Sequence, residues 1–179
     1  MKTQTAFTLI ELMTVLVVVG ILVAIAIPNV RSIVLNSRIT TKTNEFVRAI
    51  NYLRSEAIIR NNNLAIQVQP LAITLDPNNE FGGGWRVWID LNNNGEHDIG
   101  TDTIKEFDFS DDQIVINEAN DLTPIEYGNR GRPIGIYQFN ICQSGYSQGR
   151  IVQIARTGRV TTNRCYIGSE SSDSCGFTC

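Results

Sequence analysis

The segment DLNNNGEHDIGTD, residues 90–102, places oxygen-bearing side chains at alternate positions before a glycine, as a calcium-binding loop does. The residues that would supply ligands are Asp90, Asn92, Asn94, Glu96 through its carbonyl, and Asp98. Thr101 stands where such a loop normally ends in glutamate. Because Asp and Asn also favour turns without any ion, a solvated turn between two strands remains an alternative to a calcium site.

Arginine is concentrated in the C-terminal third of the chain. Positions 130 to 164 hold no acidic residue and six arginines: Arg130, Arg132, Arg150, Arg156, Arg159 and Arg164. Residues 76–126, in contrast, hold thirteen acidic residues against Arg86 and Lys105. Grouped guanidinium groups can bind phosphates and give salt-dependent DNA binding. Contact with the acidic segment of the same chain or of an adjacent subunit is the favoured alternative.

Four cysteines lie in the C-terminal quarter: Cys142, Cys165, Cys175 and Cys179. An even number of clustered cysteines is typical of disulfide-bonded proteins outside the reducing cytoplasm. Of the three pairings that four cysteines permit, we favour Cys142 with Cys165 and Cys175 with Cys179. The cysteines lack a CxxC spacing and are remote in sequence from His97, which argues against a zinc site.

Catalytic patterns are missing from the sequence. His97 is the single histidine, and no Ser-His-Asp set, P-loop or dinucleotide fingerprint accompanies it. The paired acids Asp111 and Asp112 are adjacent, so a strand would point them to opposite faces. We therefore expect no enzyme activity and, calcium aside, no cofactor.

Glu11 is the charged residue in the least expected place, inside the apolar run Phe7–Ile27. About 20 apolar residues span a bilayer, and the run is longer than the core of a secretory signal peptide, so it predicts a membrane anchor. A carboxylate at the bilayer centre costs about 2.5 to 3.5 kcal/mol and usually marks a function. The alternative is a carboxylate near the headgroups, since Glu11 lies about 6 Å along a helix from Phe7.

Helical periodicity continues beyond the apolar run. Apolar residues recur at spacings of three and four: Val30, Ile33, Val34, Phe46, Ile50, Leu53, Ala57 and Ile58. Pro28 predicts a kink near the membrane exit, and Asn61–Asn63 predict the end of the helix. One helix from Phe7 to Arg60 is therefore expected, with an amphipathic second half.

After residue 63 the apolar period changes from 3.6 to 2, which indicates strands. They are expected around residues 64–68, 71–75, 85–89, 103–109, 113–116, 135–141 and 150–155, with one more after the turn RTGRV. An antiparallel sheet needs cover for its apolar face, and the amphipathic stripe of the helix can supply it.

The N-terminus closely resembles that of type IV pilins and type II secretion pseudopilins, because a short leader, MKTQTA, precedes FTLIELMTVLVVVGILVAIAIP. The resemblance implies cleavage by a prepilin peptidase between Ala6 and Phe7 and N-methylation of Phe7. The family usually has glycine at the position of Ala6. The resemblance also implies that Glu11 pairs with the N-terminal ammonium of a neighbouring subunit and sets its register in the fibre.

The segments GGGWRVWIDLNNNGEHD and GRIVQIARTGRVTTNRC resemble the GspH/FimT-like head of minor pilins and minor pseudopilins. Minor subunits of this kind are thought to initiate assembly in a tip complex. Some FimT-like pseudopilins bind DNA through a C-terminal Gly-Arg-x-Arg motif. Gly158 and Arg159 match its first half, whereas Thr161 replaces its second arginine. The resemblance therefore implies Arg159 as a DNA-binding residue, and the arginines expected to cluster near the same turn are Arg150, Arg156 and Arg164.

These patterns predict an α+β, pilin-like fold, with a long N-terminal helix packed on an antiparallel β-sheet head. The expected divisions are a leader (1–6), a transmembrane helix half (7–28), an amphipathic helix half (29–62) and a β-rich head (63–179). The expected function is that of a minor pilin in type IV pilus assembly, within the tip or initiation complex. The alternatives are a FimT-like pseudopilin that binds DNA for natural transformation and a minor pseudopilin of type II secretion.

The expected partners are other major and minor pilins, the prepilin peptidase, the inner-membrane assembly platform, the inner membrane itself and, under the alternative function, DNA. The chain should cross the inner membrane once, with a cytoplasmic N-terminus and a periplasmic head, before it enters the pilus or pseudopilus.

Overall fold

A single long helix, α1 (Leu9–Arg60), begins the fold. The computed structural model describes residues 7–60, 66–70, 81–92, 94, 97–98, 100, 103–108, 113–119, 124–128, 130–168, 174–175 and 177. The chain divides into two compact units, Met1–Ser37 and Arg38–Cys179. The predicted helix is confirmed to within two residues at its start, and it ends at Arg60 as expected.

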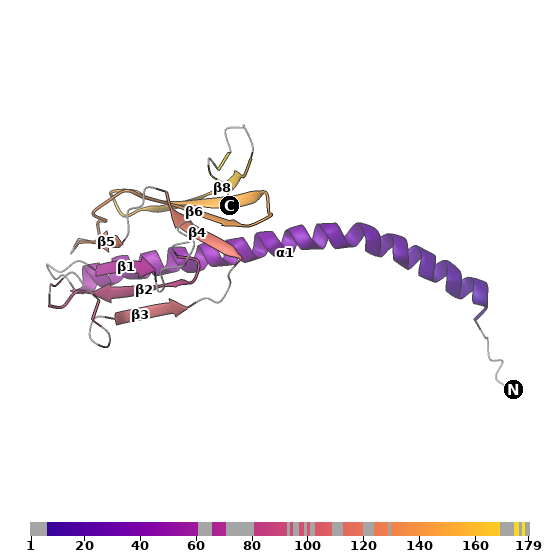
Figure 1. The fold of residues 1–179 in the computed structure, drawn as a ribbon, viewed down its shortest axis with the longest axis horizontal. Coiled ribbons are helices and arrows are strands. Elements are labelled where there is room, and N and C mark those ends of the chain that lie inside the picture. Colours follow the sequence, from indigo (N-terminus) through magenta and orange to yellow (C-terminus); the bar gives the residue numbers. More distant parts are fainter. Residues whose placement is uncertain are drawn as a thin grey trace. The chain divides into compact units, whose positions relative to one another are not determined.

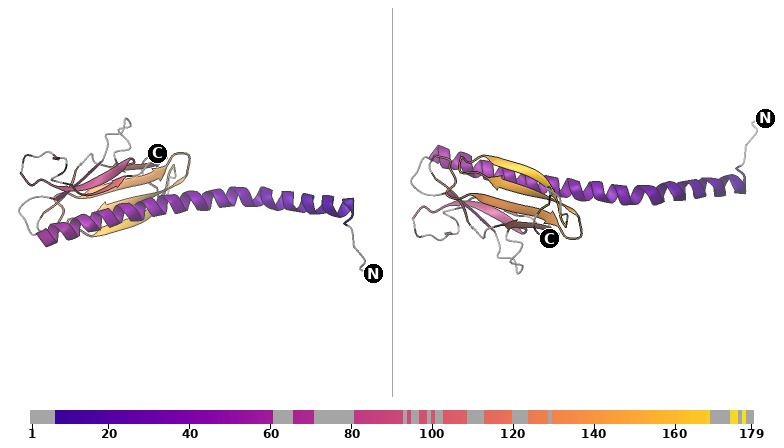
Figure 2. Two further views of the ribbon diagram at one scale, coloured as in Figure 1. Left: turned by 90° about the horizontal axis from the view of Figure 1, so that it is seen from below. Right: turned by 90° about the horizontal axis from the view of Figure 1, so that it is seen from above.

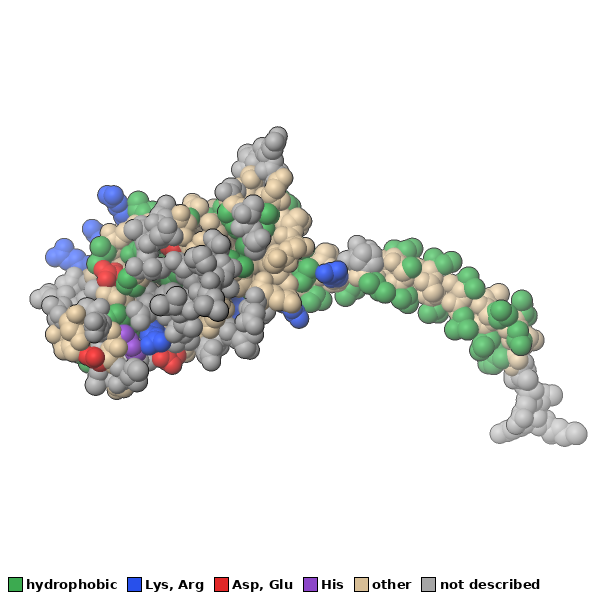
Figure 3. All heavy atoms as spheres, viewed as in Figure 1, with side chains coloured by type: hydrophobic (Ala, Val, Ile, Leu, Met, Phe, Trp, Pro, Cys, Tyr) green, Lys and Arg blue, Asp and Glu red, His purple; other side chains and the backbone are tan. Residues whose placement is uncertain are grey.

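Within the first unit, the part of α1 up to Ile27 carries apolar side chains around the helix. From Phe7 to Ile27 its large apolar residues are exposed, and Figure 3 shows them along the visible face. Among the described residues, α1 is long and apolar enough to cross a membrane, by length and composition alone. A helix that is apolar all round requires an apolar environment on every side.

The described strands form two four-stranded antiparallel sheets (Figure 1). The first has the order β3-β2-β1-β5 and consists of β1 (Ile66–Pro70), β2 (Gly84–Ile89), β3 (Thr103–Asp108) and β5 (Ile125–Tyr127). The second has the order β4-β6-β7-β8 and consists of β4 (Ile114–Glu118), β6 (Tyr137–Gln143), β7 (Gln148–Ile154) and β8 (Val160–Tyr166).

Two aspects of the sheets differ from the sequence-based expectation. The strands pair into two sheets rather than one. A period of two residues determines which face of a sheet a side chain lies on, but it does not determine which strand lies beside it. β5 has only three residues, too few for a recognisable alternation. The strand expected at 71–75 lies outside the described residues.

The C-terminal half of α1 runs alongside both sheets (Figures 1 and 2) and buries one stripe against them. Its buried apolar residues are Ile39, Phe46, Ala49, Ile50, Leu53 and Ala57. Phe46 is central, because its ring centroid lies 4.9 Å from that of Trp85 on β2 and 4.8 Å from that of Phe139 on β6. One helical side chain therefore joins the two sheets through edge-on aromatic contacts.

Replacement of Phe46 by alanine should therefore destabilise the head by about 3 to 5 kcal/mol, since it leaves a cavity where the helix meets both sheets. Urea denaturation of a fragment starting at Arg38 measures this free energy of unfolding. Asn44→Ala, at an exposed position on the same helix, should change it by less than about 0.5 kcal/mol. Equal losses for the two variants would contradict the assigned core.

Candidate assembly site and head surface

The N-terminus of α1 is capped by Thr8. The Thr8 hydroxyl accepts a hydrogen bond from the Glu11 backbone N–H at 3.3 Å, and the Thr8 carbonyl accepts one from Leu12 N–H at 3.2 Å. Glu11 thus occupies the third position of the helix, where a negative charge is favoured by the helix dipole. Thr8 was not among the predicted site residues, although a Thr-x-x-Glu pattern before an apolar run is a known helix-start signal.

The carboxylate of Glu11 projects from an apolar surface. Phe7 is 84 % exposed, Ile10 67 % and Leu12 60 %, and Glu11 itself is exposed. Among the described residues no basic side chain forms an ion pair with it. A single copy of the chain therefore presents a charged group on a surface suited to lipid or to other apolar helices. Ala6 lies outside the described residues, so cleavage and methylation next to Phe7 remain predictions.

The disulfide pairing predicted from the sequence is wrong. Cys165 is bonded to Cys175, whose backbone N–H also donates to the carbonyl of Tyr166 at 2.9 Å. The chain near Cys175 returns beside the end of β8, whereas β7 separates Cys142 on β6 from Cys165 on β8. Cys142 is also disulfide-bonded, and Cys179 lies outside the described residues.

Gly149 explains how the bridge fits against β7. A side chain at this position would start 3.3 Å from the sulfur of Cys175, 3.4 Å from that of Cys165 and 3.0 Å from the carbonyl oxygen of Ile141. The missing side chain therefore leaves room for both sulfur atoms over the sheet.

Peptide mapping of the non-reduced protein tests this bridge. Cleavage after Arg164 and after Glu170 separates Cys165, in peptide 165–170, from Cys175, in peptide 171–179. Mass spectrometry should find these two peptides joined through Cys165 and Cys175. A direct link between the peptide containing Cys142 and peptide 165–170 would contradict the structure.

Arg150, selected from the sequence as a phosphate ligand, is buried and faces inward. Its guanidinium donates to the hydroxyl of Thr40 on α1 at 3.0 Å and to the carbonyl of Gly149 at 3.0 Å. Burial, followed by the charge of Arg164, lowers the pKa of Arg150. Its side chain connects β7 to the helix, so the selection of Arg150 as a surface ligand is corrected.

The other selected arginines are exposed, and two of them flank a tight turn. Arg156 and Arg159 enclose Thr157 and Gly158, whose carbonyls accept hydrogen bonds from Arg54 of α1 at 3.3 and 3.1 Å. Arg164 lies farther along β8. The helix therefore fixes the position of the turn that carries Arg156 and Arg159.

A second arginine-bearing loop meets this turn. A side chain at Gly158 would start only 2.8 Å from the carbonyl oxygen of Gly131, which lies between the exposed residues Arg130 and Arg132. Figure 3 shows Lys and Arg side chains projecting from the end of the head near β5. We call Arg130, Arg132, Arg156 and Arg159 the arginine surface. None of the four forms an ion pair with a described acidic residue.

Glycine at position 158 is required both by backbone conformation and by close approach. Its φ of 78° is unfavourable for other residues, and Gly158→Ala would also collide with the Gly131 carbonyl. Gly145 is a matched control, because its φ is 75° and it has open space around it. Thermal unfolding should show Gly145→Ala losing about 1 to 2 kcal/mol and Gly158→Ala losing distinctly more. Equal losses would contradict the packed junction.

Within the candidate calcium loop, the described residues Asp90, Asn92, Asn94 and Asp98 form hydrogen bonds with one another. The buried carboxylate of Asp90 accepts a hydrogen bond from Asn94 N–H at 3.1 Å, and Asp98 accepts from the side-chain amides of Asn92 at 2.6 Å and Asn94 at 3.4 Å. The side-chain oxygen of Asn92 also accepts a hydrogen bond from Asn94 N–H at 3.1 Å, which is the two-residue spacing of an Asx turn. The described part of the chain contains no group of three His, Cys, Asp or Glu residues able to hold a metal ion. Glu96 lies outside it, so the calcium prediction is untested.

Together, an apolar helix with a capped, glutamate-bearing start and a helix-backed antiparallel head define a pilin-like subunit. The chain belongs to the GspH family, because the model of type II transport protein GspH matches residues 42–158. The prokaryotic N-terminal methylation motif matches residues 1–27. Membership of this family implies contact with other pilin-like subunits in a pilus or pseudopilus and a structural role rather than an enzymatic one.

The fold is similar to that of a solved type IV minor pilin, FimU of Pseudomonas aeruginosa. The TM-score is 0.54 at 23 % sequence identity, and the match covers 69 % of this chain and 91 % of that one. No protein with a curated description is significantly similar to the chain in sequence. The predicted helix-anchored pilin fold is thus confirmed.

Proposed function

We propose that the protein is a minor subunit that takes part in type IV pilus assembly, in the tip or initiation complex. A prepilin peptidase would cleave it between Ala6 and Phe7, and Phe7 would then be N-methylated. Before assembly, the apolar half of α1 would hold it in the inner membrane with its head in the periplasm. Assembly would transfer that half of α1 from lipid to the fibre core through the inner-membrane platform.

The observation that carries this proposal is the exposed Glu11 carboxylate, one helical turn from Phe7 on a helix that is apolar all round. A charge in an apolar environment is costly unless it is paired. The ammonium group created by cleavage at Phe7 in a neighbouring subunit would have the opposite charge and the same depth. Pairing between subunits would therefore neutralise both groups and set the axial register.

The Glu11→Ala variant should still be synthesised, cleaved and inserted into the membrane. Its incorporation into sheared surface fibres should be strongly reduced. If the protein initiates assembly, the number of fibres should fall as well. Glu11→Gln should be defective as well, because it keeps the shape and removes the charge. Immunoblots of membrane and fibre fractions provide the measurement.

Thr14→Val is the matched control, since the Thr14 hydroxyl bonds only the Glu11 carbonyl one turn along the same helix. It should assemble normally. Normal piliation by Glu11→Ala would refute the assembly role. Loss of exoprotein secretion with intact pili on deletion of the gene would move the protein to a type II secretion pseudopilus.

The arginine surface favours DNA binding as a second candidate function. It brings four exposed guanidinium groups together from two loops that meet at Gly131 and Gly158, and the Arg54 hydrogen bonds fix one of these loops. Several uncompensated cations on one surface attract the phosphate backbone without reading its sequence. This function would serve natural transformation.

A head fragment starting at Arg38 should retard duplex DNA at low salt, with affinity that falls as salt rises. The double variant Arg156→Gln/Arg159→Gln should bind at least about tenfold more weakly with a shallower salt dependence, since it removes two phosphate contacts. Arg48→Gln, on the exposed face of α1, should bind as the parent does. Electrostatic binding to DNA is much tighter at about 50 mM salt than at higher salt. Absence of binding at about 50 mM salt would therefore exclude this function.

A further inference from the structure

The outer edge of β3 has no partner strand among the residues that the structure describes. β3 is the terminal strand of its sheet, with β2 on its inner side, and no further strand among the described residues pairs with it. An edge strand presents backbone N–H and C=O groups that a strand from another chain can pair with. Lys105 and Glu106, in the middle of β3, are both exposed.

A groove of about 480 Å³ lies between this edge and α1. Its walls are Glu45, Arg48 and Tyr52 from the helix and Lys105 and Phe107 from β3. All five belong to the compact unit that starts at Arg38. Lys105 and Phe107 are paired with Val87 and Trp85, whose side chains are buried in the core beside α1, and so share the sheet face toward the helix.

The charges in this groove do not balance. The Glu45 carboxylate lies 3.5 Å from the ammonium of Lys42, and the two opposite charges form an ion pair. Arg48 and Lys105 form no ion pair with a described residue, and the Lys105 ammonium lies over the rings of Phe107, at 4.8 Å, and Tyr52, at 5.4 Å. The groove thus combines two cations with two aromatic rings.

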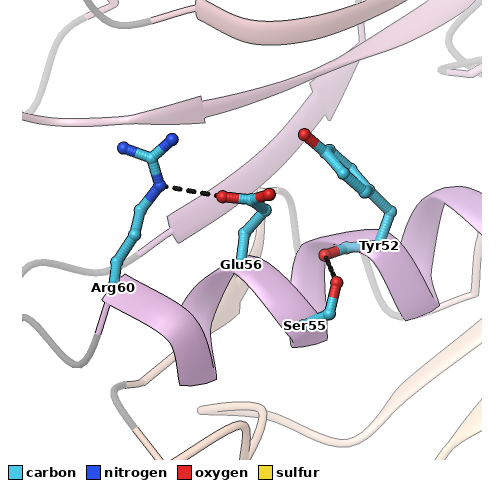
Figure 4. Close-up of polar contacts among 4 residues, drawn as sticks. All are labelled: Tyr52, Ser55, Glu56 and Arg60. Atoms are coloured by element: carbon cyan, nitrogen blue, oxygen red, sulfur yellow. Dashed lines mark hydrogen bonds and ion pairs between the residues drawn. The ribbon is translucent and has the colours of Figure 1, made fainter.

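Glu56, the next acidic residue of α1 after Glu45, is paired with Arg60. Figure 4 shows Glu56 bonded to Arg60 one turn beyond Tyr52, with 2.9 Å between the Arg60 Nε and the Glu56 carboxylate. Partial burial, followed by the nearby Glu56 charge, raises the pKa of Tyr52. Arg48 and Lys105 therefore set the local field.

We propose that β3 and this groove bind an extended acidic segment from the head of a different pilin-like subunit. The segment would add a strand to the β3 edge, and alternate side chains would then point toward α1. A carboxylate among them would lie between Arg48 and Lys105, and an apolar side chain two residues away would pack on Tyr52 and Phe107. This inference rests on the proposed function, because it supplies the contact through which the subunit meets its neighbour outside the membrane.

Site-specific photo-cross-linking in cells tests the proposal. Phe107 is replaced in the full chain by benzoylphenylalanine, which keeps an aromatic ring in the groove and leaves both cations in place. After irradiation, mass spectrometry maps the cross-linked residue. The same cross-linker at Gln153, an exposed position on β7, serves as the control. The expected adduct joins position 107 to an Asp- or Glu-containing extended segment of another pilin-like subunit and is absent at position 153.

Charge reversal then tests the chemistry of the contact. Lys105→Glu and Arg48→Glu should each reduce the adduct at least about fivefold, and a lysine in place of the partner's carboxylate should restore it. Thr162→Glu, at an exposed position on β8 outside the groove, should leave the yield unchanged. An adduct only with a second copy of this chain, an adduct insensitive to charge reversal, or no adduct would each overturn the proposal.

The fibre fraction separates this inference from the proposed function. If the cross-linker variant enters sheared fibres but forms no adduct, the groove proposal fails and the assembly role survives. If the unmodified protein is absent from the fibres and Glu11→Ala has no effect on piliation, the assembly role itself fails.

Discussion

One helix that must satisfy two environments is the constraint on which this molecule depends. From Leu9 to Ile27 α1 carries apolar side chains on every side, with Glu11 as the one charged residue, which suits lipid or the interior of a fibre. From Arg38 onward the same helix keeps a single apolar stripe, and Phe46 at its centre contacts both sheets. The head can therefore form around the helix end, while the first half remains available for insertion and assembly.

The functional features follow from this division. The start of the helix places Thr8 and Glu11 where a cap and a negative charge are favoured, and the surrounding apolar surface leaves the carboxylate in need of a partner. At the other end, Arg54 binds the carbonyls of Thr157 and Gly158 and so fixes the turn that carries Arg156 and Arg159. The helix thus positions a candidate assembly residue and a candidate binding surface.

Sequence patterns that arise from one element were predictable here, and patterns that depend on pairing were not. The buried stripe of Phe46, Ile50 and Leu53 follows from helical periodicity, and the run Asn61–Asn63 predicted the end of α1 at Arg60. The Cys165–Cys175 bridge depends on which strands are neighbours, which alternation does not encode. The burial of Arg150 depends on the approach of Thr40 from a segment 110 residues away. The number of arginines in a segment does not reveal which of their side chains are buried.

The central claim is that the Glu11 carboxylate is neutralised by the terminal amine of a neighbouring subunit. Zero-length carbodiimide coupling of intact fibres, followed by mass spectrometry, measures this contact directly. The account predicts an amide bond between Glu11 and the first residue of an adjacent mature subunit, with little coupling of Glu11 to an added soluble amine. Efficient coupling of Glu11 to the soluble amine, with no link between subunits, would contradict it.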